Sequence, residues 1–312
     1  MSFRAIFFGT PEFAVPSLEA LMDIADVASV VCQPDRPANR GLELTAPPVK
    51  LCALAKGLTV VQPDKVKTPE FAHWVREQNA DVALVVAYGR ILPKAVLDAP
   101  RTGCINVHAS LLPKFRGAAP IAWSIVRGER RTGITLMQMD EGMDTGPMLE
   151  QLPVEIAEDE TCGDLAKRLA ELGALGVRRG LPRWIRGEYE PTPQDHSAST
   201  MAPMLKKEDG RIDWAKPARA VHDLVRGMNP WPMAQTTLRG KRVVIHQTRV
   251  ANDEPPKAAA GTVVFADKSH VLVQAGQGIV ELLRVQLEGK KPIRGTEWLS
   301  GRGVQEGDVL GP

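Results

Sequence analysis

Cysteine and histidine are too few and too scattered to indicate a metal site or a disulfide framework. The 312-residue sequence has four cysteines without a Cys-x-x-Cys pair, and six histidines without a His-Glu-x-x-His motif. Zinc sites usually depend on such close spacings, and disulfide frameworks are typical of short, cysteine-rich secreted chains. We therefore expect no bound metal and no disulfide.

Long apolar segments are also missing. No apolar run reaches the ~18 residues that a membrane-spanning helix needs. The segment from Met1 to Gly9 reads as a strand, because it is too short for the apolar region of a signal peptide and has no small-residue cleavage site. We expect a cytoplasmic protein that does not associate with a membrane.

The turn after the first predicted strand lacks the glycines of a nucleotide-binding loop. It reads Phe8-Gly9-Thr10-Pro11, with neither Gly-x-Gly-x-x-Gly nor a Gly-Lys-Ser/Thr ending. A binding site for the phosphates of a dinucleotide or a nucleoside triphosphate is therefore disfavoured at this turn. Another ligand must use the carboxyl edge of the sheet, where open α/β folds usually place their sites.

Charge is nearly balanced at +2, but it is unevenly distributed. Residues 206–312 carry 17 Lys and Arg against 12 Asp and Glu, a net +5, whereas residues 1–205 carry a net −3. A basic C-terminal third is compatible with an anionic partner such as nucleic acid. An ordinary solvated surface would explain the same modest excess.

The first half of the chain alternates apolar, β-rich runs with helical patterns, which is typical of βαβ units on a parallel sheet. One helix is predicted to start with Thr68 as N-cap and Pro69 at the first helical position. A later helix opens at Thr161 with an apolar stripe that we interpret as core packing. The predicted strands are Ala5–Phe8, Ala28–Cys32, Thr59–Gln62, Val82–Ala87, Cys104–His108 and Ile134–Met139. The stripe consists of Leu165, Leu169, Leu172 and Leu175.

The pattern changes in the last third. Glu188–Ser199 is polar, contains two prolines and has no periodicity, as expected of a linker. Beyond it, a helix at Ala218–Met228 precedes short strands at close spacing, which favour a small β-barrel of the oligonucleotide-binding (OB) kind. Those strands are Lys241–Val250, Gly261–Phe265, His270–Gln274 and Ile279–Gln286. We predict an α/β domain with a Rossmann-like parallel sheet at 1–189, a linker at 190–205 and an OB-like domain at 206–312.

Asn106 and His108 are the strongest candidates for catalysis. Side chains alternate along a strand, so both project from the same face at the end of Cys104–His108. An amide can bind a developing oxyanion, and an imidazole can donate to it or move a proton, as an acyl-type transfer needs. The alternative is a polar pair that satisfies backbone groups of the following loop.

Two loops accompany this pair. The first is a loop whose conformation is restricted by prolines and a glycine; it begins with Ser110, Leu111, Leu112 and Pro113 and leads to a helix near Pro120. Its leucines must pack inward or line an apolar pocket. Asp144 lies between Gly142 and Gly146 in a second loop. A carboxylate beside His108 would orient the ring and favour its protonated form, whereas an Asx-turn is the simpler explanation for an Asp between glycines.

Together these stretches resemble the formyltransferase family that uses the N10-formyl derivative of tetrahydrofolate. Asn106-x-His108, the loop Ser110–Pro113 with Phe115-Arg116-Gly117, and Asp144-Thr145-Gly146 match its catalytic set in order and spacing. The resemblance extends over nearly the whole chain and is closest to the members that formylate methionyl-tRNA. Further matching segments are Ala5–Ala14, Gln33-Pro34-Asp35-Arg36-Pro37, Gly117–Ile121, Asn229-Pro230-Trp231-Pro232 and Gly289-Lys290-Lys291.

The resemblance implies transfer of a formyl group from 10-formyltetrahydrofolate to the free amine of initiator methionyl-tRNA. Asn106 and protonated His108 would stabilise the oxyanion, and Asp144 would hold the imidazole and help to collect the amine proton. Ser110, Leu111, Leu112 and Pro113 would shape the folate pocket, with a contribution from Arg90-Ile91-Leu92. No metal is implied, and we expect a monomer.

The resemblance also implies a tRNA-binding loop after the second strand, here Arg36–Thr45. Arg36 and Arg40 are basic, but Leu42 and Glu43 stand where relatives usually carry lysines. Lys206 and Lys207 are further candidates for phosphate contacts from the C-terminal domain. Lys241, Arg242, Lys290 and Lys291 complete the set of basic candidates there.

Four alternatives remain open at this point. Related domains formylate glycinamide ribonucleotide or an amino sugar nucleotide, or hydrolyse formyl-folate. A non-catalytic RNA-binding relative is the alternative from a different class. The basic loop and C-terminal domain favour tRNA over small acceptors, and the joint presence of Asn106, His108 and Asp144 disfavours a purely binding role.

Overall fold

The computed structural model describes residues 3–38 and 43–311. By internal contacts the chain divides into two compact units. The first unit comprises Met1–Pro120, Arg131–Glu155 and Ala166–Pro203, and the second comprises Ile121–Arg130, Ile156–Leu165 and Met204–Pro312. The domain boundaries predicted at 189 and 206 stay a prediction. No helix in the described part of the chain is long and apolar enough to cross a membrane.

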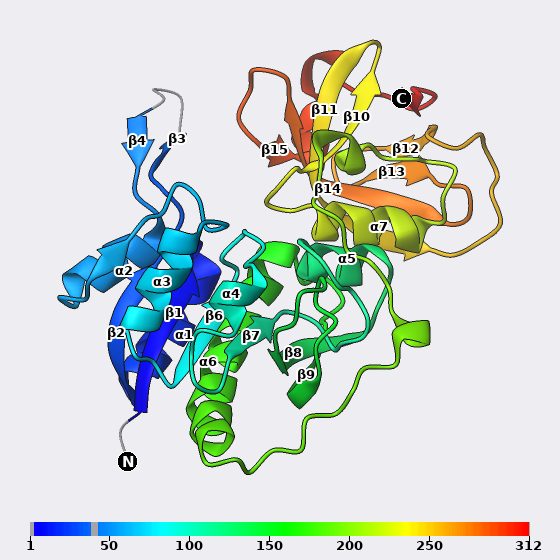
Figure 1. The fold of residues 1–312 in the computed structure, drawn as a ribbon. Coiled ribbons are helices and arrows are strands. Elements are labelled where there is room, and N and C mark those ends of the chain that lie inside the picture. The colour runs from blue at the N-terminus through cyan, green and yellow to red at the C-terminus, as the bar shows by residue number, and fades with distance from the viewer. Residues whose placement is uncertain (1–2, 39–42, 312) are drawn as a thin grey trace. The chain divides into compact units, whose positions relative to one another are not determined.

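A seven-stranded sheet forms the centre of the first unit (Figure 1). All six strands predicted in the first half are present, and Met148–Glu155 adds a seventh. In sheet order the strands are β5 (Val60–Val61), β2 (Ala25–Val31), β1 (Phe3–Gly9), β6 (Val82–Val86), β7 (Cys104–His108), β8 (Arg131–Gln138) and β9 (Met148–Glu155). The first five run parallel, so the predicted α/β class is confirmed.

The last two strands depart from the predicted βαβ pattern. Strand β8 pairs antiparallel with both β7 and β9. The turn between β8 and β9 spans only residues 139–147, too short for the helical crossover that returns a chain to a parallel neighbour. The sheet is therefore mostly parallel with an antiparallel edge, and Asn106 pairs with a parallel strand on one side and an antiparallel strand on the other.

Helices cover both faces of this sheet. On one face, α3 (Pro69–Glu77) and α4 (Lys94–Leu97) pack on side chains of β1, β6 and β7. Thr68 caps α3 as predicted, because its hydroxyl accepts a 3.2 Å hydrogen bond from the Phe71 amide. Helix α6 (Cys162–Ile185) lies on the other face, where Gly173 approaches Val107 and Ser17 of α1 (Val15–Met22).

One residue of the apolar stripe predicted for α6 does not lie in the core, so that part of the prediction is wrong. Leu165 and Leu169 are fully buried, but Leu175 is 44% exposed. Leu175 lies ten positions after Leu165, and ten steps of 100° carry it about 80° away from that face. The helix instead brings Gly176 and Gly180 against Leu152 and Leu136, where added Cβ atoms would come within 2.9 and 2.3 Å of the leucine side chains.

The remaining elements of the first unit are short. The segment predicted as a basic loop contains a two-stranded hairpin of β3 (Arg36–Ala38) and β4 (Glu43–Thr45). Helix α2 (Pro48–Ala55) follows it, and 3-10 turns occur at Glu12–Ala14 and His196–Ala198. Residues 190–203 pack on this unit, with Arg116 and Ala202 joined by a backbone hydrogen bond of 2.7 Å.

The second unit is built around an antiparallel sheet. Its strand order is β12 (Val263–Ala266), β13 (Val271–Gln274), β14 (Ile279–Leu287), β11 (Lys241–Asn252), β10 (Ala234–Leu238) and β16 (Leu310–Gly311), with β15 (Ile293–Arg294) paired to β14. A bridge between Thr262 and Val309 connects the two ends of this path, so the sheet curls into a small barrel. The fold class predicted for this part is confirmed.

Helices of the second unit pack on the barrel. Helix α7 (Ala218–Gly227) buries Val221 and Val225 in the barrel core, which also contains Trp214 and Trp298. Gly227 of α7 approaches Val126 of α5 (Pro120–Val126). Two 3-10 helices complete the unit, at Lys207–Gly210 and Gly295–Arg302.

Candidate active site

The end of strand β7 places Asn106 and His108 on the same face. Asn106 is half-buried, and within the described residues its side-chain amide has no hydrogen-bond partner. His108 is 5% exposed. With no partner in the described part of the chain, the Asn106 amide is available to a bound molecule.

His108 is held between two loops. Its Nε2 lies 2.9 Å from the Phe115 carbonyl oxygen, and its Nδ1 lies 3.6 Å from Oδ2 of Asp144. A carbonyl oxygen only accepts, so Nε2 carries a proton and donates it to Phe115. Any proton on Nδ1 then faces the Asp144 carboxylate. The ring thus satisfies a loop carbonyl and also faces a carboxylate.

Asp144 occupies a strained position that directs its carboxylate inward. Its φ is +54°, in the left-handed region that side chains rarely adopt. Oδ2 accepts a 2.7 Å hydrogen bond from the Gly117 amide. The local turn is instead made by Asp140, whose Oδ1 accepts from the Gly142 amide and the Thr145 hydroxyl. The turn contacts expected of an Asp between these glycines are thus made by Asp140, and the role of the Asp144 carboxylate stays a prediction.

The segment Ser110–Pro113 is tied to its surroundings by hydrogen bonds. The buried Ser110 hydroxyl donates to the Lys114 carbonyl at 2.6 Å, and the Leu112 amide donates to the Thr135 hydroxyl at 3.1 Å. Gln151 donates to the Leu112 carbonyl at 2.7 Å. Leu112 itself packs inward at 3% exposure. These hydrogen bonds fix the segment that connects β7 to Phe115, whose carbonyl oxygen contacts His108.

A hollow of about 140 Å³ adjoins Asp144. Its walls come from the loop Arg90-Ile91-Leu92 and from the end of β8 with the following turn, including Met137, Met139 and Met143. Ile91 and Met143 are more than half exposed, so the hollow presents apolar surface to solvent. Arg90–Leu92 line this hollow, whereas Ser110–Pro113 do not.

Sequence reasoning missed a side chain that joins the two loops around His108. Gln194 is 5% exposed, and its amide nitrogen donates to the carbonyls of Asp144 and Gly146 at 2.9 and 2.7 Å. Its amide oxygen accepts two hydrogen bonds, of 3.0 and 2.6 Å, from the buried Arg116 guanidinium. Gln194 lies in the segment that reads as a linker, and no local pattern distinguishes it from its polar neighbours.

A second hydrogen-bond network ends at the residues that precede Arg90. The Gln33 amide donates to the carbonyls of Tyr88 and Gly89, directly before the wall at Arg90. Lys50 donates to both carboxylate oxygens of Asp35 and to Gln62. The hydrogen bonds from Lys50 and Gln62 hold the pKa of Asp35 below its usual range.

The four basic residues predicted to bind tRNA are placed as follows. Arg36 is exposed at the start of β3, and its guanidinium donates to the Gln33 side chain at 2.7 Å. Arg40 lies outside the described residues. Lys206 and Lys207 are exposed in the second unit, where Lys207 begins a 3-10 helix. Their role in binding stays a prediction.

Thiol chemistry has no support near the site. Cys104 lies on β7 two residues before Asn106, and burial raises the pKa of its thiol to about 12. Burial likewise raises the pKa of Cys32 to about 11. All four cysteines are free thiols. A thiolate nucleophile is therefore disfavoured, because the thiolate is the reactive form. Among the described residues, no group of three or more His, Cys, Asp or Glu side chains could hold a metal ion.

Comparison with known proteins defines the class of this chain. The formyl transferase family matches residues 3–180, and the formyl transferase C-terminal domain family matches residues 204–303. Methionyl-tRNA formyltransferases of Sorangium cellulosum and Acetivibrio thermocellus are 58% and 47% identical over 309 residues, which cover 99% of this chain and of each relative. The chain belongs to the methionyl-tRNA formyltransferase family.

Solved structures of lower identity share the fold. The sugar 3N-formyl transferase WlaRD is 17% identical with a TM-score of 0.66, covering 93% of this chain and 99% of that one. An N-formyltransferase from Helicobacter canadensis has the same TM-score and identity, covering 90% of this chain and 99% of its own. At this identity the likeness shows the fold alone.

Proposed function

We propose that this chain transfers the formyl group of 10-formyltetrahydrofolate to the amino group of methionyl initiator tRNA, giving the formylated tRNA that starts translation. The observation that carries the proposal is the 58% identity to a methionyl-tRNA formyltransferase across 99% of both chains. The geometry around His108 and the unpaired amide of Asn106 support formyl transfer as its chemistry.

The reaction needs one bond formed and one broken. The amine nitrogen bonds to the formyl carbon, and the bond between that carbon and N10 of the folate breaks. The amine releases one proton in this exchange, and N10 gains one. The chain must therefore stabilise negative charge on the formyl oxygen and hold or move a proton beside it.

Asn106, His108 and Asp144 can divide these tasks. The Asn106 amide N–H donates to the formyl oxygen, which is the use that its lack of an internal partner leaves open. When His108 is protonated, its Nδ1–H lies too far from Asp144, at 3.6 Å, for a hydrogen bond and serves as the second donor. Asp144, 3.6 Å from Nδ1 of His108, stabilises the charged ring and helps to collect the proton that leaves the amine.

The hollow beside Asp144 suits the heterocyclic end of the donor, whose ring faces pack on apolar side chains and whose edge carries N–H donors. Ile91, Leu92, Met139 and Met143 supply apolar surface, and Asp140 and Glu141 supply acceptors. Its volume of about 140 Å³ accommodates one end of the donor rather than the whole molecule. Ser110, Leu111, Leu112 and Pro113 contribute from the other side of His108 by shaping the loop that carries Phe115.

We propose that basic residues of both units hold the tRNA acceptor. Arg36 and Arg40 on the segment around the β3–β4 hairpin would meet phosphates close to the reacting end. Lys206 and Lys207 would add contacts from the second unit. The protein is proposed to act as a monomer in the cytoplasm, where translation takes place.

An acceptor panel tests the function. The purified protein is given 10-formyltetrahydrofolate and, in turn, methionyl initiator tRNA, methionyl elongator tRNA, glycinamide ribonucleotide and an amino sugar nucleotide. We expect formylation largely confined to the initiator tRNA. Transfer to a small acceptor would keep the catalytic assignment and overturn the tRNA assignment. Donor binding without any transfer would overturn the catalytic assignment.

A further inference from the structure

The side chain of Gln33 joins two segments that lie far apart in the sequence. Its amide nitrogen donates to the carbonyl oxygens of Tyr88 and Gly89 at 3.0 and 3.1 Å. Its amide oxygen accepts a 2.7 Å hydrogen bond from the Arg36 guanidinium. Within the described residues, the hydrogen bonds of this one side chain therefore reach the turn before Arg90 and the first residue of the β3–β4 hairpin.

The turn at one end of this connection has a backbone that needs support. Ala87 has a φ of +47° and Gly89 a φ of +78°, both in the left-handed region that costs free energy for a residue with a side chain. A Cβ atom at position 89 would lie 2.9 Å from the Gln33 amide nitrogen, so the glycine also leaves room for this amide. Arg90 follows immediately and lines the hollow beside Asp144. The Gln33 amide thus fixes the turn that leads into the wall of the hollow.

The backbone of Gln33 is held independently of its side chain. Its carbonyl oxygen accepts a 2.8 Å hydrogen bond from the Gln62 amide, and its N–H donates to the Thr10 hydroxyl at 3.3 Å. The Gln62 amide also donates to Asp35 at 2.8 Å. Because this backbone is held, the position of the Gln33 amide depends on the turn and on the arginine that it contacts.

The other end of the connection is an exposed cation. Arg36 is exposed at the start of β3 and uses one guanidinium nitrogen, Nη2, to contact Gln33. A guanidinium has five N–H donors, so Nη2 can keep its contact with Gln33 while the other nitrogens bind an anion. An anion bound there restricts the Arg36 side chain and, through Gln33, the turn before Arg90.

We propose that Gln33 is a positioning residue that couples binding of the tRNA acceptor at Arg36 to binding of the folate donor beside Arg90. This inference rests on the proposed function, which assigns the acceptor to the hairpin and the donor to the hollow. An acceptor phosphate at Arg36 orders the Gln33 amide, the amide orders the turn, and the donor then binds a wall that is already formed. Because coupling between two binding sites is reciprocal, the donor strengthens tRNA binding by the same factor.

The affinity for the donor with and without tRNA measures the coupling in the full-length protein. Titration calorimetry gives the dissociation constant of 10-formyltetrahydrofolate, alone and with saturating unacylated initiator tRNA, which carries no methionyl amine to be formylated. The ratio of the two constants is the coupling factor, and we expect about fivefold or more for the wild type. A wild-type ratio of 1 would overturn the proposal.

Two variants break the connection at different points. Gln33→Ala removes two hydrogen bonds to the turn, so the dissociation constant of the donor alone should rise by roughly 2- to 10-fold. Its coupling factor should fall to about 1. Arg36→Ala keeps both bonds to the turn and removes only the exposed end, so it should lose the coupling with little change in affinity for the donor alone. Since Arg36 is exposed, this second variant tests the proposal even if Gln33→Ala does not fold.

Thr10→Val is the matched control for a purely structural effect. The Thr10 hydroxyl donates to the same Tyr88 carbonyl at 3.1 Å, and in the described part of the chain it has no hydrogen bond to Arg36. This variant should weaken donor binding to the same degree with and without tRNA, so its coupling factor should stay at the wild-type value. A wild-type coupling factor in Gln33→Ala would show that Gln33 only stabilises the turn, and would overturn the proposal.

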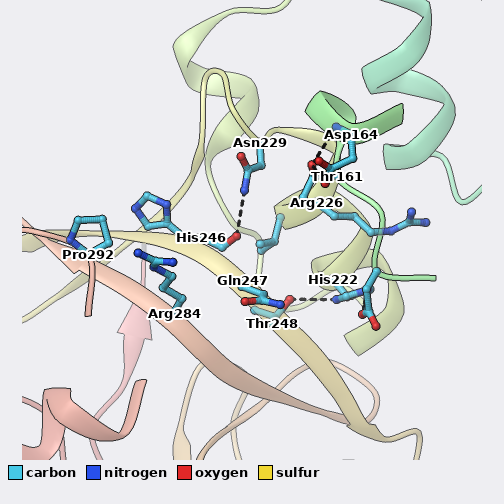
Figure 2. Close-up of a pocket in the computed structure, with 12 residues that line it drawn as sticks. Thr161, Asp164, His222, Arg226, Asn229, His246, Gln247, Thr248, Arg284 and Pro292 are labelled. Carbon is cyan, nitrogen blue, oxygen red and sulfur yellow. Dashed lines mark hydrogen bonds and ion pairs between the residues drawn. The ribbon is translucent and has the colours of Figure 1, made fainter. Parts of the chain in front are cut away.

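A glutamine of the second unit is the control for loss of an amide as such. Gln247 lines a polar hollow of about 320 Å³ together with His222 and Asn229 (Figure 2). Hydrogen bonds there join Asn229 to the His246 carbonyl and His222 to the Thr248 hydroxyl, and within the described residues none reaches the Gln247 side chain. Gln247→Ala should change neither the affinity for the donor nor the coupling factor. An equal loss of coupling in this variant would show that the effect is not specific to Gln33.

The outcomes separate this inference from the proposed function. If the wild type formylates methionyl initiator tRNA but its affinity for the donor does not respond to tRNA, the coupling through Gln33 is overturned and the function stands. If the wild type formylates only a small acceptor and binds no initiator tRNA, the proposed function has failed and the coupling falls with it.

Discussion

The amide nitrogen of Gln194 lies 2.9 Å from the carbonyl oxygen of Asp144, and the amide oxygen of the same side chain lies 2.6 Å from the Arg116 guanidinium. One side chain thereby joins the loop that carries Asp144 to the loop that carries Phe115. His108 contacts both loops, since Nε2 faces Phe115 and Nδ1 faces Asp144. We infer that Gln194 positions the two loops around His108 and Asp144, the residues proposed for catalysis.

Gln194→Ala should therefore reduce both stability and turnover. It removes the acceptor of two hydrogen bonds from Arg116, which keeps its 3.2 Å contact with His196 Nδ1, and it removes the donor to two loop carbonyls. An unsatisfied buried group costs roughly 1–3 kcal/mol. Urea unfolding and kcat for formyl transfer measure the two effects. Gln277→Ala, which removes an exposed amide in the second unit, is the matched control and should change neither by much.

Gln194→Glu separates the two contacts. A carboxylate still accepts from Arg116 but no longer donates to the carbonyls of Asp144 and Gly146. We expect this variant to keep more stability than Gln194→Ala while it loses turnover to a similar degree. A wild-type kcat in Gln194→Glu would show that the Asp144 loop does not depend on the amide donors.

Asn106→Ala tests the oxyanion role. Removal of one oxyanion donor typically costs about 2.7–4 kcal/mol of barrier lowering, a fall in kcat of roughly 10²–10³-fold. Because the Asn106 amide has no partner within the described residues, the Tm should change little. Single-turnover kinetics with saturating donor measure the chemical step. Near wild-type turnover in a folded Asn106→Ala protein would reject the assignment.

The Asp35–Lys50 pair makes a pH-dependent contribution to stability. Hydrogen bonds from Lys50 and Gln62 lower the pKa of Asp35, so the folded state favours its ionised form. Such a contribution is complete above the unfolded pKa of about 3.9 and is lost as pH falls through the lower folded pKa. Asp35→Asn should thus be less stable than the wild type at pH 7, and the difference should shrink below about pH 4.

Urea unfolding at pH 7, 5 and 3.5 measures this difference. A gap between wild type and Asp35→Asn that stays constant over this range would contradict the linkage.

Tyr88→Phe should be neutral or stabilising. Tyr88 is 2% exposed, its hydroxyl has no hydrogen-bond partner within the described residues, and burial raises its pKa to about 12. A buried hydroxyl without a partner loses its hydrogen bonds to water and gains none in return. Thermal unfolding should therefore show an unchanged or higher Tm.

The second tyrosine of the chain is the control. The Tyr189 hydroxyl donates to Glu150 at 2.5 Å, so Tyr189→Phe should lower stability by about 1 kcal/mol. A large loss of stability in Tyr88→Phe, equal to or above that of Tyr189→Phe, would show that the Tyr88 hydroxyl has a partner.

Local patterns in the sequence were enough to predict much of this protein. Apolar, β-rich runs located all six strands predicted in the first half, and Thr68 with Pro69 located the start of α3. The common orientation of Asn106 and His108 was also predictable, because side chains alternate along a strand and residues two apart share a face in any fold. These features depend on neighbours in the chain.

Contacts between distant segments were decided only by the tertiary structure. The turn between β8 and β9 is too short for a crossover, so the sheet ends in an antiparallel edge and the turn carrying Asp144 comes to face β7. Gln194 reaches Asp144 across fifty residues from a segment without periodicity. Periodicity reports which side of an element is buried, but partner choice depends on packing and loop length over the whole chain, which no local pattern encodes.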